Sequence, residues 1–213
     1  RQGRFWINIQ GVAQSPAPES LLYELLIPYH FKPRKIHYLY SRRTEESGAI
    51  YTSPTHHLLK NRTHWIVQPL PDPNTPQRTD LPYSNSYDTV PLPPRHHLFW
   101  AIIHLLDASP PPITTTPDHV TLDASKLTFP LHLRHWRAGD VFFPAGMNGK
   151  HKKVGKFFKD LKIHRFEKEE IWLLCTAKDE IAWILGYRAD ERFLAKADAT
   201  KLWEGRLKQS GDA

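Results

Sequence analysis

The clearest periodic pattern in this chain lies between Lys150 and Ile163. Apolar residues recur there at spacings of three and four, so on a helix their side chains would share one face: Val154, Phe157, Phe158 and Leu161. Lysines take most of the other positions: Lys150, Lys152, Lys153, Lys156, Lys159 and Lys162. The pattern predicts one amphipathic helix over this stretch, with a strongly basic exposed surface.

The pattern of residues 1–68 predicts a strand, two helices and a hairpin. Residues 5–9 are apolar enough for a short strand, and prolines near residue 16 precede a helical stripe of leucines that ends at Pro28. A second helix is expected from Pro33 to about Arg43. Residues 57–60 and 64–67 then flank a tight turn, which is typical of a β-hairpin.

The remaining strand signals lie in the second half of the chain. Residues 97–106 form a long apolar run that fits a strand or a buried helix, and its aromatic and β-branched content favours a strand. Residues 120–123 and 129–136 alternate between apolar and polar positions. Two continuous apolar runs, 171–176 and 181–185, predict a buried hairpin.

These elements predict an α+β chain in four parts. Residues 1–68 hold the helix pair and hairpin, and residues 69–118 are crowded with proline, so we expect a stiff connector with one strand-like run. Residues 119–205 are expected to form a β-sandwich-like domain that carries the basic amphipathic helix. Residues 206–213 are polar, and we expect a frayed tail.

The positive charge of the chain is concentrated in one region. The 213 residues carry a net charge of +7. Residues 130–168 contain ten Lys or Arg residues against three Asp or Glu residues, a surplus equal to the whole net charge. Such localised charge is typical of a surface that binds a polyanion, with nucleic acid ahead of an acidic protein or a membrane. The alternative is an ordinary solvated lysine face on a packed helix.

Composition narrows the class of protein further. A hydrophobic content of 40% indicates a folded globular chain, and no apolar run is long enough for a membrane span. The one cysteine, Cys175, lies in an apolar run, so we expect a buried thiol in a reducing, cytoplasmic compartment. Because the chain begins at Arg1 without a leader, we expect a fragment or a processed form of a longer protein.

No catalytic or metal-binding pattern stands out. The glycines form neither a P-loop nor a Ser-Gly-Gly-x-Asp-Ser loop. The thirteen histidines lack cysteine partners and the His-Glu-x-x-His spacing, so we expect no metal site. Asp140, Asp160 and Asp190 lie beside basic residues, which favours structural ion pairs over acid–base catalysis. We therefore predict no catalytic residue and no cofactor in this chain.

A multi-part motif extends over about 75 residues. Its parts are Arg134-x-Trp136-x-x-Gly139-Asp140, Pro144-x-Gly146-Met147-x-Gly149, Lys152-Lys153-Val154-x-x-Phe157-Phe158-x-Asp160 and Gly186-x-Arg188-x-Asp190-x-Arg192-Phe193. In this order they strongly resemble the C-terminal domain of bacterial tRNA(Ile)-lysidine synthetases. A weaker resemblance to the preceding segment of some members covers residues 16–67.

The resemblance implies an enzyme that uses ATP and Mg to adenylate the wobble cytidine of an isoleucine tRNA and then replaces AMP with lysine. In that family the ATP-binding loop belongs to an N-terminal domain, whose signature is absent here, so the resemblance implies a non-catalytic part that holds tRNA(Ile). The family fold is a β-sandwich with helices, similar to a domain of the phenylalanyl-tRNA synthetase β chain. Implied partners are tRNA(Ile) and the enzyme's own catalytic domain, with a homodimer as a further candidate.

Charge and resemblance together define the candidate tRNA-binding residues. They are Lys150, Lys152, Lys153, Lys156, Lys159, Lys162, Arg134, Arg137, Arg188 and Arg192. For Arg134, Arg188 and Arg192, structural pairing with Asp140 and Asp190 is a nearly equal alternative. We expect a structural role for the other motif residues, which are Trp136, Gly139, Asp140, Gly146, Met147, Asp160 and Asp190. Two other functions stay open: an assembly module with a merely solvated basic face, and a freestanding RNA-binding adaptor.

Overall fold

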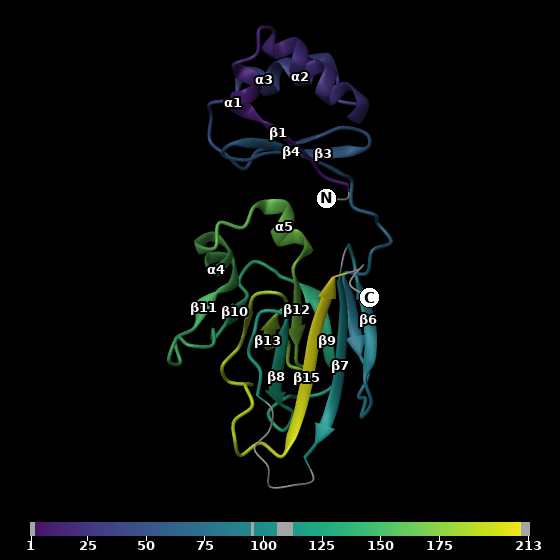
Figure 1. Cartoon of the computed structure of the whole chain (residues 1–213), viewed down its shortest axis with the longest axis vertical. Coiled ribbons are helices and arrows are strands. Elements are labelled where there is room, and N and C mark those ends of the chain that lie inside the picture. Colours follow the sequence, from purple (N-terminus) through teal and green to yellow (C-terminus); the bar gives the residue numbers. More distant parts are fainter. Residues whose placement is uncertain (1–2, 95, 106–112, 210–213) are drawn as a thin grey trace. The chain divides into compact units, whose positions relative to one another are not determined.

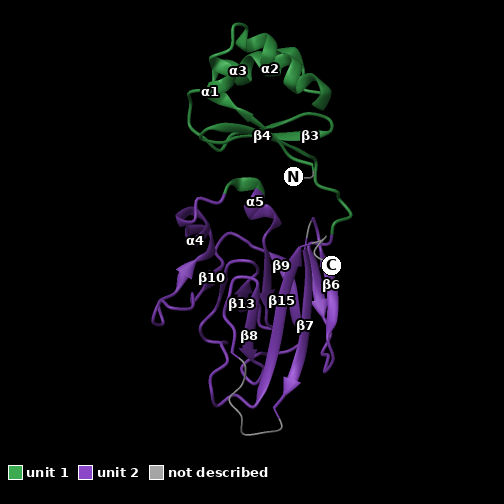
Figure 2. Cartoon of the chain, viewed as in Figure 1, with its two compact units in different colours: residues 1–75, 164–166 green, residues 76–163, 167–213 purple. Residues whose placement is uncertain are grey.

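The computed structural model of the chain describes residues 3–94, 96–105 and 113–209 (Figure 1). It divides into two compact units (Figure 2). Unit 1 contains residues 1–75 and 164–166, and unit 2 contains residues 76–163 and 167–213. Helix and strand are mixed, so the predicted α+β class is confirmed.

Unit 1 is a four-stranded antiparallel sheet with helices against one face. The strand order is β1-β4-β3-β2. The strands are β1 (Phe5–Asn8), β2 (Ile50–Thr52), β3 (His56–Lys60) and β4 (His64–Pro69), and the helices are α1 (Ile9–Ala13), α2 (Pro18–Leu26), the 3-10 turn η1 (Ile27–Tyr29) and α3 (Pro33–Ser41).

Apolar side chains on alternate strand positions build the core of unit 1. Leu58 and Trp65 face the helices and pack with Leu22, Leu26 and Leu39, each of which is fully buried. On the opposite face Leu59 and Ile66 pack against Phe166, which also belongs to unit 1. The sheet of unit 1 therefore buries apolar side chains on both faces.

The predicted elements of unit 1 are confirmed. The hairpin turn falls at Asn61–Thr63, where the backbone N–H of Asn61 donates to the carbonyl of His64 at 2.8 Å. Pro18 and Pro33 occupy the first position of their helices, where a missing N–H costs nothing. Before Pro28, helix α2 ends at Leu26 and tightens into η1.

Unit 2 is a β-sandwich with two short helices. Its five-stranded sheet has the order β14-β13-β12-β9-β5 and its four-stranded sheet the order β6-β7-β15-β8, while β10 pairs with β11. The strands are β5 (Arg78–Leu81), β6 (Asp88–Leu92), β7 (His96–His104), β8 (His119–Asp123), β9 (Leu131–His135), β10 (Val141–Phe142), β11 (Lys152–Lys153), β12 (Trp172–Cys175), β13 (Ile181–Ile184), β14 (Arg188–Ala189) and β15 (Lys201–Gln209). The helices are α4 (Val154–Asp160) and α5 (Arg165–Glu170), and α5 extends across the boundary between the units.

Strand alternation decides which core each side chain of unit 2 enters. Trp172 and Leu174 of β12 point into the space between the two sheets, where they pack with Trp100 of β7 and Trp203 of β15. Leu173 and Cys175 point the other way, into a second cluster that includes α4. The five-stranded sheet therefore has apolar side chains on both faces. The predicted buried hairpin and the strand assignment of residues 97–106 are confirmed for the described residues.

The predicted lysine helix is wrong in its length. Only Val154–Asp160 is helical, because Lys152 and Lys153 pair as strand β11 with Phe142 and Val141. Lys162 ends the segment in a left-handed conformation with φ of +57°. The backbone N–H and C=O groups of β11 find hydrogen-bond partners in β10, whereas in a longer helix they would have bonded within the helix. Leu161, assigned to the apolar stripe, has 49% of its surface exposed.

The proline-rich connector and the frayed tail also differ from the structure. Residues 78–81 and 88–92 are strands of the sandwich, and Leu81 and Leu92 lie in its core. Both strands lie at sheet edges. Proline is tolerated there because an edge strand has no neighbour on one side, so the N–H that proline lacks is not needed for a hydrogen bond between strands. Residues 206–209 continue β15, which pairs with β7 as far as Gln209 opposite His96. Residues 210–213 of the predicted tail and residues 106–112 of the predicted connector lie outside the described residues.

Gly205 allows two tryptophan rings to pack across the centre of β15. A Cβ atom at this position would lie 2.5 Å from ring atoms of Trp203 and 3.2 Å from the ring of Trp183. Trp183 and Trp203 are both fully enclosed in the sandwich core, so neither ring has room to move aside.

We therefore expect Gly205→Ala to lower the free energy of unfolding of unit 2 by about 1–3 kcal/mol through overpacking. Urea denaturation followed by tryptophan fluorescence measures this change. The matched control is Gly155→Ala in helix α4, where a new Cβ would meet Trp136 at an ordinary 3.6 Å. Because alanine is the better helix former, the control should be neutral or stabilising by up to about 1 kcal/mol. Equal stability of both variants would contradict the packing argument.

Candidate nucleic-acid interface

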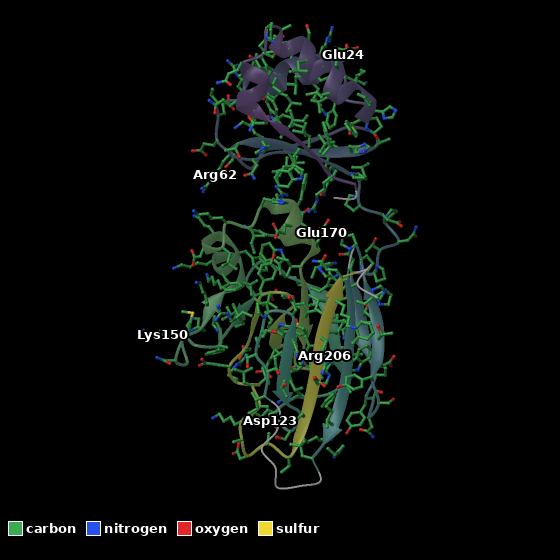
Figure 3. All side chains as sticks on the ribbon, viewed as in Figure 1. Glu24, Arg62, Asp123, Lys150, Glu170 and Arg206 are labelled. Carbon is green, nitrogen blue, oxygen red and sulfur yellow. The ribbon has the colours of Figure 1, made fainter. Side chains whose placement is uncertain are left out.

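Five exposed lysines surround β11 and α4, and we call them the lysine surface: Lys150, Lys153, Lys156, Lys159 and Lys162. Within the described part of the chain none of the five forms an ion pair. Lys150 lies on the turn that leads into β11 (Figure 3). The structure thus brings most of the predicted lysines together, although on a strand, a helix and two turns rather than on one helix.

Helix α4 is held in place by its apolar side. Val154 and Phe158 are fully buried and Phe157 nearly so, and they pack with Leu173 and Ile184 on the outer face of the five-stranded sheet. The backbone N–H of Val154 donates to the carbonyl of Asp140 at 2.9 Å. Because these contacts use the inner side of α4, Lys156 and Lys159 are left on the exposed side.

Lys152 differs from the other lysines because it has an acidic partner. Its Nζ lies 2.8 Å from Oδ2 of Asp160, and only 20% of its side chain is exposed. The hydrogen bond from Lys152 is the largest cause that lowers the pKa of the Asp160 carboxyl, and the charges of Lys156 and Lys159 lower this pKa further. The Asp160 carboxylate is therefore surrounded by positive charge and pairs with Lys152, which fits the structural role expected for Asp160.

Arg134 is buried in a network of carboxylates beneath this region. Its side chain is only 2% exposed. Nη1 and Nη2 donate to the two oxygens of Asp140 at 2.9 and 3.0 Å, and Nε donates to Asp179 at 2.7 Å. Asp140 also accepts the backbone N–H of Arg137 at 2.7 Å. The guanidinium is enclosed and satisfied, so this geometry favours the structural alternative for Arg134.

Asp179 is the member of this network that the sequence analysis missed. It lies in the turn between β12 and β13, 45 residues from Arg134 along the chain. It also accepts from His132 at 3.1 Å, and Cys175 lies nearby, within 4.8 Å by its sulfur atom. The sequence did show a carboxylate in the turn of the predicted hairpin. The Arg134–Asp179 pair could be inferred only once it was known that β12 of this hairpin lies beside β9.

The cluster of His132, Cys175 and Asp179 offers three donor atoms of the kinds that bind metals. The guanidinium of Arg134 already occupies Asp179, and a second positive charge there would be repelled. Burial raises the pKa of the Cys175 thiol to about 12, as expected for the buried, unreactive thiol predicted from the sequence. Burial also lowers the pKa of His132. These contacts favour a structural role for the cluster, with Asp179 as the ionised partner of Arg134.

Arg192 and Asp190 form a second ion pair, in which Asp190 is buried and the side chain of Arg192 is 36% exposed. The guanidinium donates to both oxygens of Asp190 at 3.0 Å and to Glu180 at 3.2 Å, and it stacks on the ring of Phe143 at 4.3 Å. Asp190 is fully buried and also accepts the backbone N–H of Phe143 at 2.8 Å. Here too the contacts favour the structural alternative.

Arg137 and Arg188 remain exposed. Arg137 lies 3.7 Å from Asp179, and Arg188 donates to the carbonyl of Ala145 at 3.0 Å. Arg188 therefore anchors the 144–149 loop and does not pair with either predicted aspartate. Both side chains keep donors directed to the surface, so they stay candidates for binding an anion.

The contacts of the other motif residues are architectural. Trp136 packs edge-on against Phe158 with ring centroids 5.7 Å apart. Gly139 and Gly146 have φ of +99° and +85°, a region that favours glycine. The N–H of Met147 closes the turn by donating to the carbonyl of Pro144 at 3.1 Å. These contacts form the base on which β10, β11 and α4 rest.

The geometry defines a β-sandwich domain with a cluster of exposed lysines beside β11 and α4, and comparisons with known proteins specify the family. Residues 1–70 match the family model described as "TilS substrate binding domain", and residues 131–207 match "TilS substrate C-terminal domain". Together these two models cover more than half of the chain. The chain belongs to the tRNA(Ile)-lysidine synthase family.

Individual relatives agree with this assignment. The chain is 36% identical over 188 residues to tRNA(Ile)-lysidine synthase of Parabacteroides distasonis, and 34% identical over 198 residues to that of Porphyromonas gingivalis. Each match covers 88% of this chain and 41% of the relative, so the chain spans less than half the length of these proteins. A solved structure titled "Crystal structure of TILS C-terminal domain" matches with a TM-score of 0.53 at 22% identity, over 64% of this chain and 98% of that one. At this level of identity, the likeness to the solved structure shows only that the matched part of this chain has a similar fold.

Helix lengths bear on membrane association. Among the helices of the described residues, none is long and apolar enough to cross a membrane.

Substitution of Arg134 should destabilise unit 2 strongly. Arg134→Met removes the guanidinium and leaves Asp140, whose side chain is 13% exposed, without its bidentate partner. We expect a loss of about 3–5 kcal/mol in the free energy of unfolding, measured by urea denaturation. The control Arg137→Met removes an arginine that is 62% exposed, and it should change stability by less than about 0.5 kcal/mol. Similar losses in the two variants would show that the buried network is not decisive.

The same network makes stability depend on pH. Burial alone would raise the pKa of the Asp179 carboxyl, but the hydrogen bond and charge of Arg134 outweigh it and lower this pKa below its ordinary value. The unfolded chain then binds more protons than the folded one. The stabilisation is therefore present above the unfolded-state pKa of about 3.9, and it is lost as the pH falls through the lower folded-state pKa.

We expect the free energy of unfolding to decrease below about pH 4, and to decrease less in Asp179→Asn, which has no carboxyl to protonate. Urea titrations at a series of pH values measure both curves. An unchanged pH dependence in Asp179→Asn would contradict the role given to this carboxylate.

Proposed function

We propose that this chain holds tRNA through the lysine surface of unit 2. The observation that carries the proposal is a set of five exposed lysines without ion pairs among the described residues, which lie on β11, on α4 and on the turns beside them, above a packed apolar base. Lysines at i and i+3 repel each other, and that repulsion is relieved when they face phosphates. The family of the chain supports RNA over other polyanions.

The chemistry of the lysine surface suits the backbone of double-stranded RNA. Ammonium groups neutralise phosphates without reading bases, and a duplex such as the acceptor stem of a tRNA is recognised mostly by shape and backbone. Of the predicted binding residues, we retain Lys150, Lys153, Lys156, Lys159 and Lys162, with Arg137 and Arg188 as flanking donors. Lys152 is engaged with Asp160, Arg134 is engaged in a buried network, and Arg192 is engaged with Asp190 and Glu180.

In its biological setting we propose that the chain acts as part of a tRNA(Ile)-lysidine synthase in the cytoplasm. Such an enzyme joins lysine to the wobble cytidine of tRNA(Ile) with ATP and Mg, and the ATP-binding loop of a catalytic domain would bind both. The printed sequence contains no such loop, so the role of this chain is to position tRNA for that domain. Partners of the chain are then tRNA(Ile) and the catalytic domain, and a homodimer is an alternative assembly.

The experiment is tRNA binding by the 213-residue chain across a salt series from about 50 to 400 mM. Because each phosphate contact releases counterions, we expect affinity to fall steeply with salt. Lys153→Glu, Lys156→Glu and Lys159→Glu together should remove most of the affinity and lower the slope of log affinity against log salt by about 3. Fluorescence anisotropy of labelled tRNA measures both quantities, and circular dichroism checks that the variant stays folded.

A charge-matched control separates a specific surface from overall charge. Lys156→Glu with Lys159→Glu changes the net charge as much as Lys178→Glu with Lys196→Glu, and all four side chains are exposed. Only the first pair should weaken binding. If both pairs weaken it equally, or if the chain does not bind tRNA, the lysine surface is not the tRNA site. The assembly-module alternative would then be favoured.

A further inference from the structure

The outer face of the four-stranded sheet in unit 2 carries a second cationic group, separate from the lysine surface. Strand register places Phe99 of β7 beside Arg206 of β15, and His97 beside Lys208. These side chains alternate with Leu98, Trp100 and Leu207, which point into the sandwich. Arg206 and Lys208 are exposed, and Thr89 and Pro91 of the neighbouring strand β6 are exposed as well. Figure 3 labels Arg206 on β15.

The one carboxylate within this group is already neutralised. Glu204 is 8% exposed and accepts hydrogen bonds from the Tyr87 hydroxyl, from His119 at 2.6 Å and from Arg206 at 2.7 Å. Asp88 lies opposite Trp100, so alternation directs it to the inner face. Because Arg206 and Glu204 offset each other's charge, the unpaired cation of this face among the described residues is Lys208, and Arg206 keeps an exposed guanidinium edge.

Aromatic rings accompany these cations. Nζ of Lys208 lies 5.1 Å from the ring centroid of Phe99. Tyr87 is 58% exposed, and its hydroxyl is tied to Glu204, which holds the ring at the edge of the face. We call Tyr87, Phe99, Arg206 and Lys208 the aromatic–cationic face. A sheet that presents aromatic rings beside Arg and Lys has the chemistry of a surface on which unpaired bases stack while phosphates are neutralised.

We propose that the aromatic–cationic face binds a single-stranded segment of RNA. The proposal rests on the proposed function in one respect, which is that the ligand is RNA. The lysine surface lies against the outer face of the five-stranded sheet, whereas the aromatic–cationic face is the outer face of the other sheet. The two surfaces therefore lie on opposite sides of the sandwich, so a straight duplex on the first does not reach the second. The second surface binds unpaired bases, which stack on Tyr87 and Phe99.

The test measures binding of two probes to the full 213-residue chain: a single-stranded RNA of about 12 nucleotides and an RNA duplex of the same length. Tyr87→Ala should weaken binding of the single strand by about 5- to 100-fold, because stacking of one base is lost, and should leave duplex binding unchanged within about twofold. Lys208→Glu should act in the same direction. Tyr87→Phe is the matched control, since it loses the same hydroxyl contact to Glu204 but keeps the ring, and it should bind the single strand as the parent chain does.

The outcomes separate this proposal from the proposed function. Lys156→Glu with Lys159→Glu should weaken duplex binding and spare the single strand, so either surface can fail alone. Equal binding of the single strand by Tyr87→Ala, Tyr87→Phe and the parent chain overturns the proposal. A fall in Tyr87→Phe as large as in Tyr87→Ala also overturns it, because the hydroxyl contact rather than stacking would then be responsible. Sedimentation that shows a dimer broken by Lys208→Glu overturns it in favour of contact between copies of the chain.

Discussion

The buried guanidinium of Arg134 is the interaction on which the rest of the candidate interface depends. It joins three segments: strand β9, the turn that ends at Asp140 directly after this strand, and the β12–β13 turn at Asp179, which is 45 residues from Arg134 along the chain. Asp140 in turn accepts the first backbone N–H of helix α4. A buried charge is costly unless its hydrogen bonds are complete, so the three segments are constrained to one arrangement. The lysines are thereby presented on a rigid base.

The division between arginines that pair with carboxylates and lysines that stay exposed follows from their chemistry. A planar guanidinium with several donors can satisfy two carboxylates at once, as Arg134 and Arg192 do, and can still stack on an aromatic ring. An ammonium group is more strongly hydrated and stays at the surface on a flexible stem, as Lys153, Lys156 and Lys159 do. Within one basic segment, arginine therefore supports the structure and lysine provides the charge available to a polyanion.

The same principle distinguishes the two outer faces of the sandwich. One face is covered by α4, whose apolar side fills it and whose exposed side carries unpartnered lysines. On the other face Arg206 and Lys208 are exposed, and the ring of Phe99 lies beside Lys208. A surface of ammonium groups favours the regular phosphate backbone of a duplex, whereas rings beside cations favour unpaired bases. Under the two proposals made above, the unit presents two chemically different faces to RNA.

Local pattern was enough to predict the helices α2 and α3, the hairpin at Asn61, the strands β7, β9, β12 and β13, and the basic segment itself, because periodicity and proline act over a few residues. It failed where a distant partner decides the outcome. Lys152 and Lys153 are a strand because Val141 and Phe142 pair with them, and the proline-rich residues 78–92 are strands because a sheet edge accepts them. Arg134 was identified as basic from the sequence, but its burial depends on Asp179, 45 residues away.

The sequence by itself determined the family, the class of fold and the location of the charge, since these depend on residue type and order. Only the tertiary structure decided which charges are free, because a side chain is neutralised by whatever the fold places within hydrogen-bond distance of it.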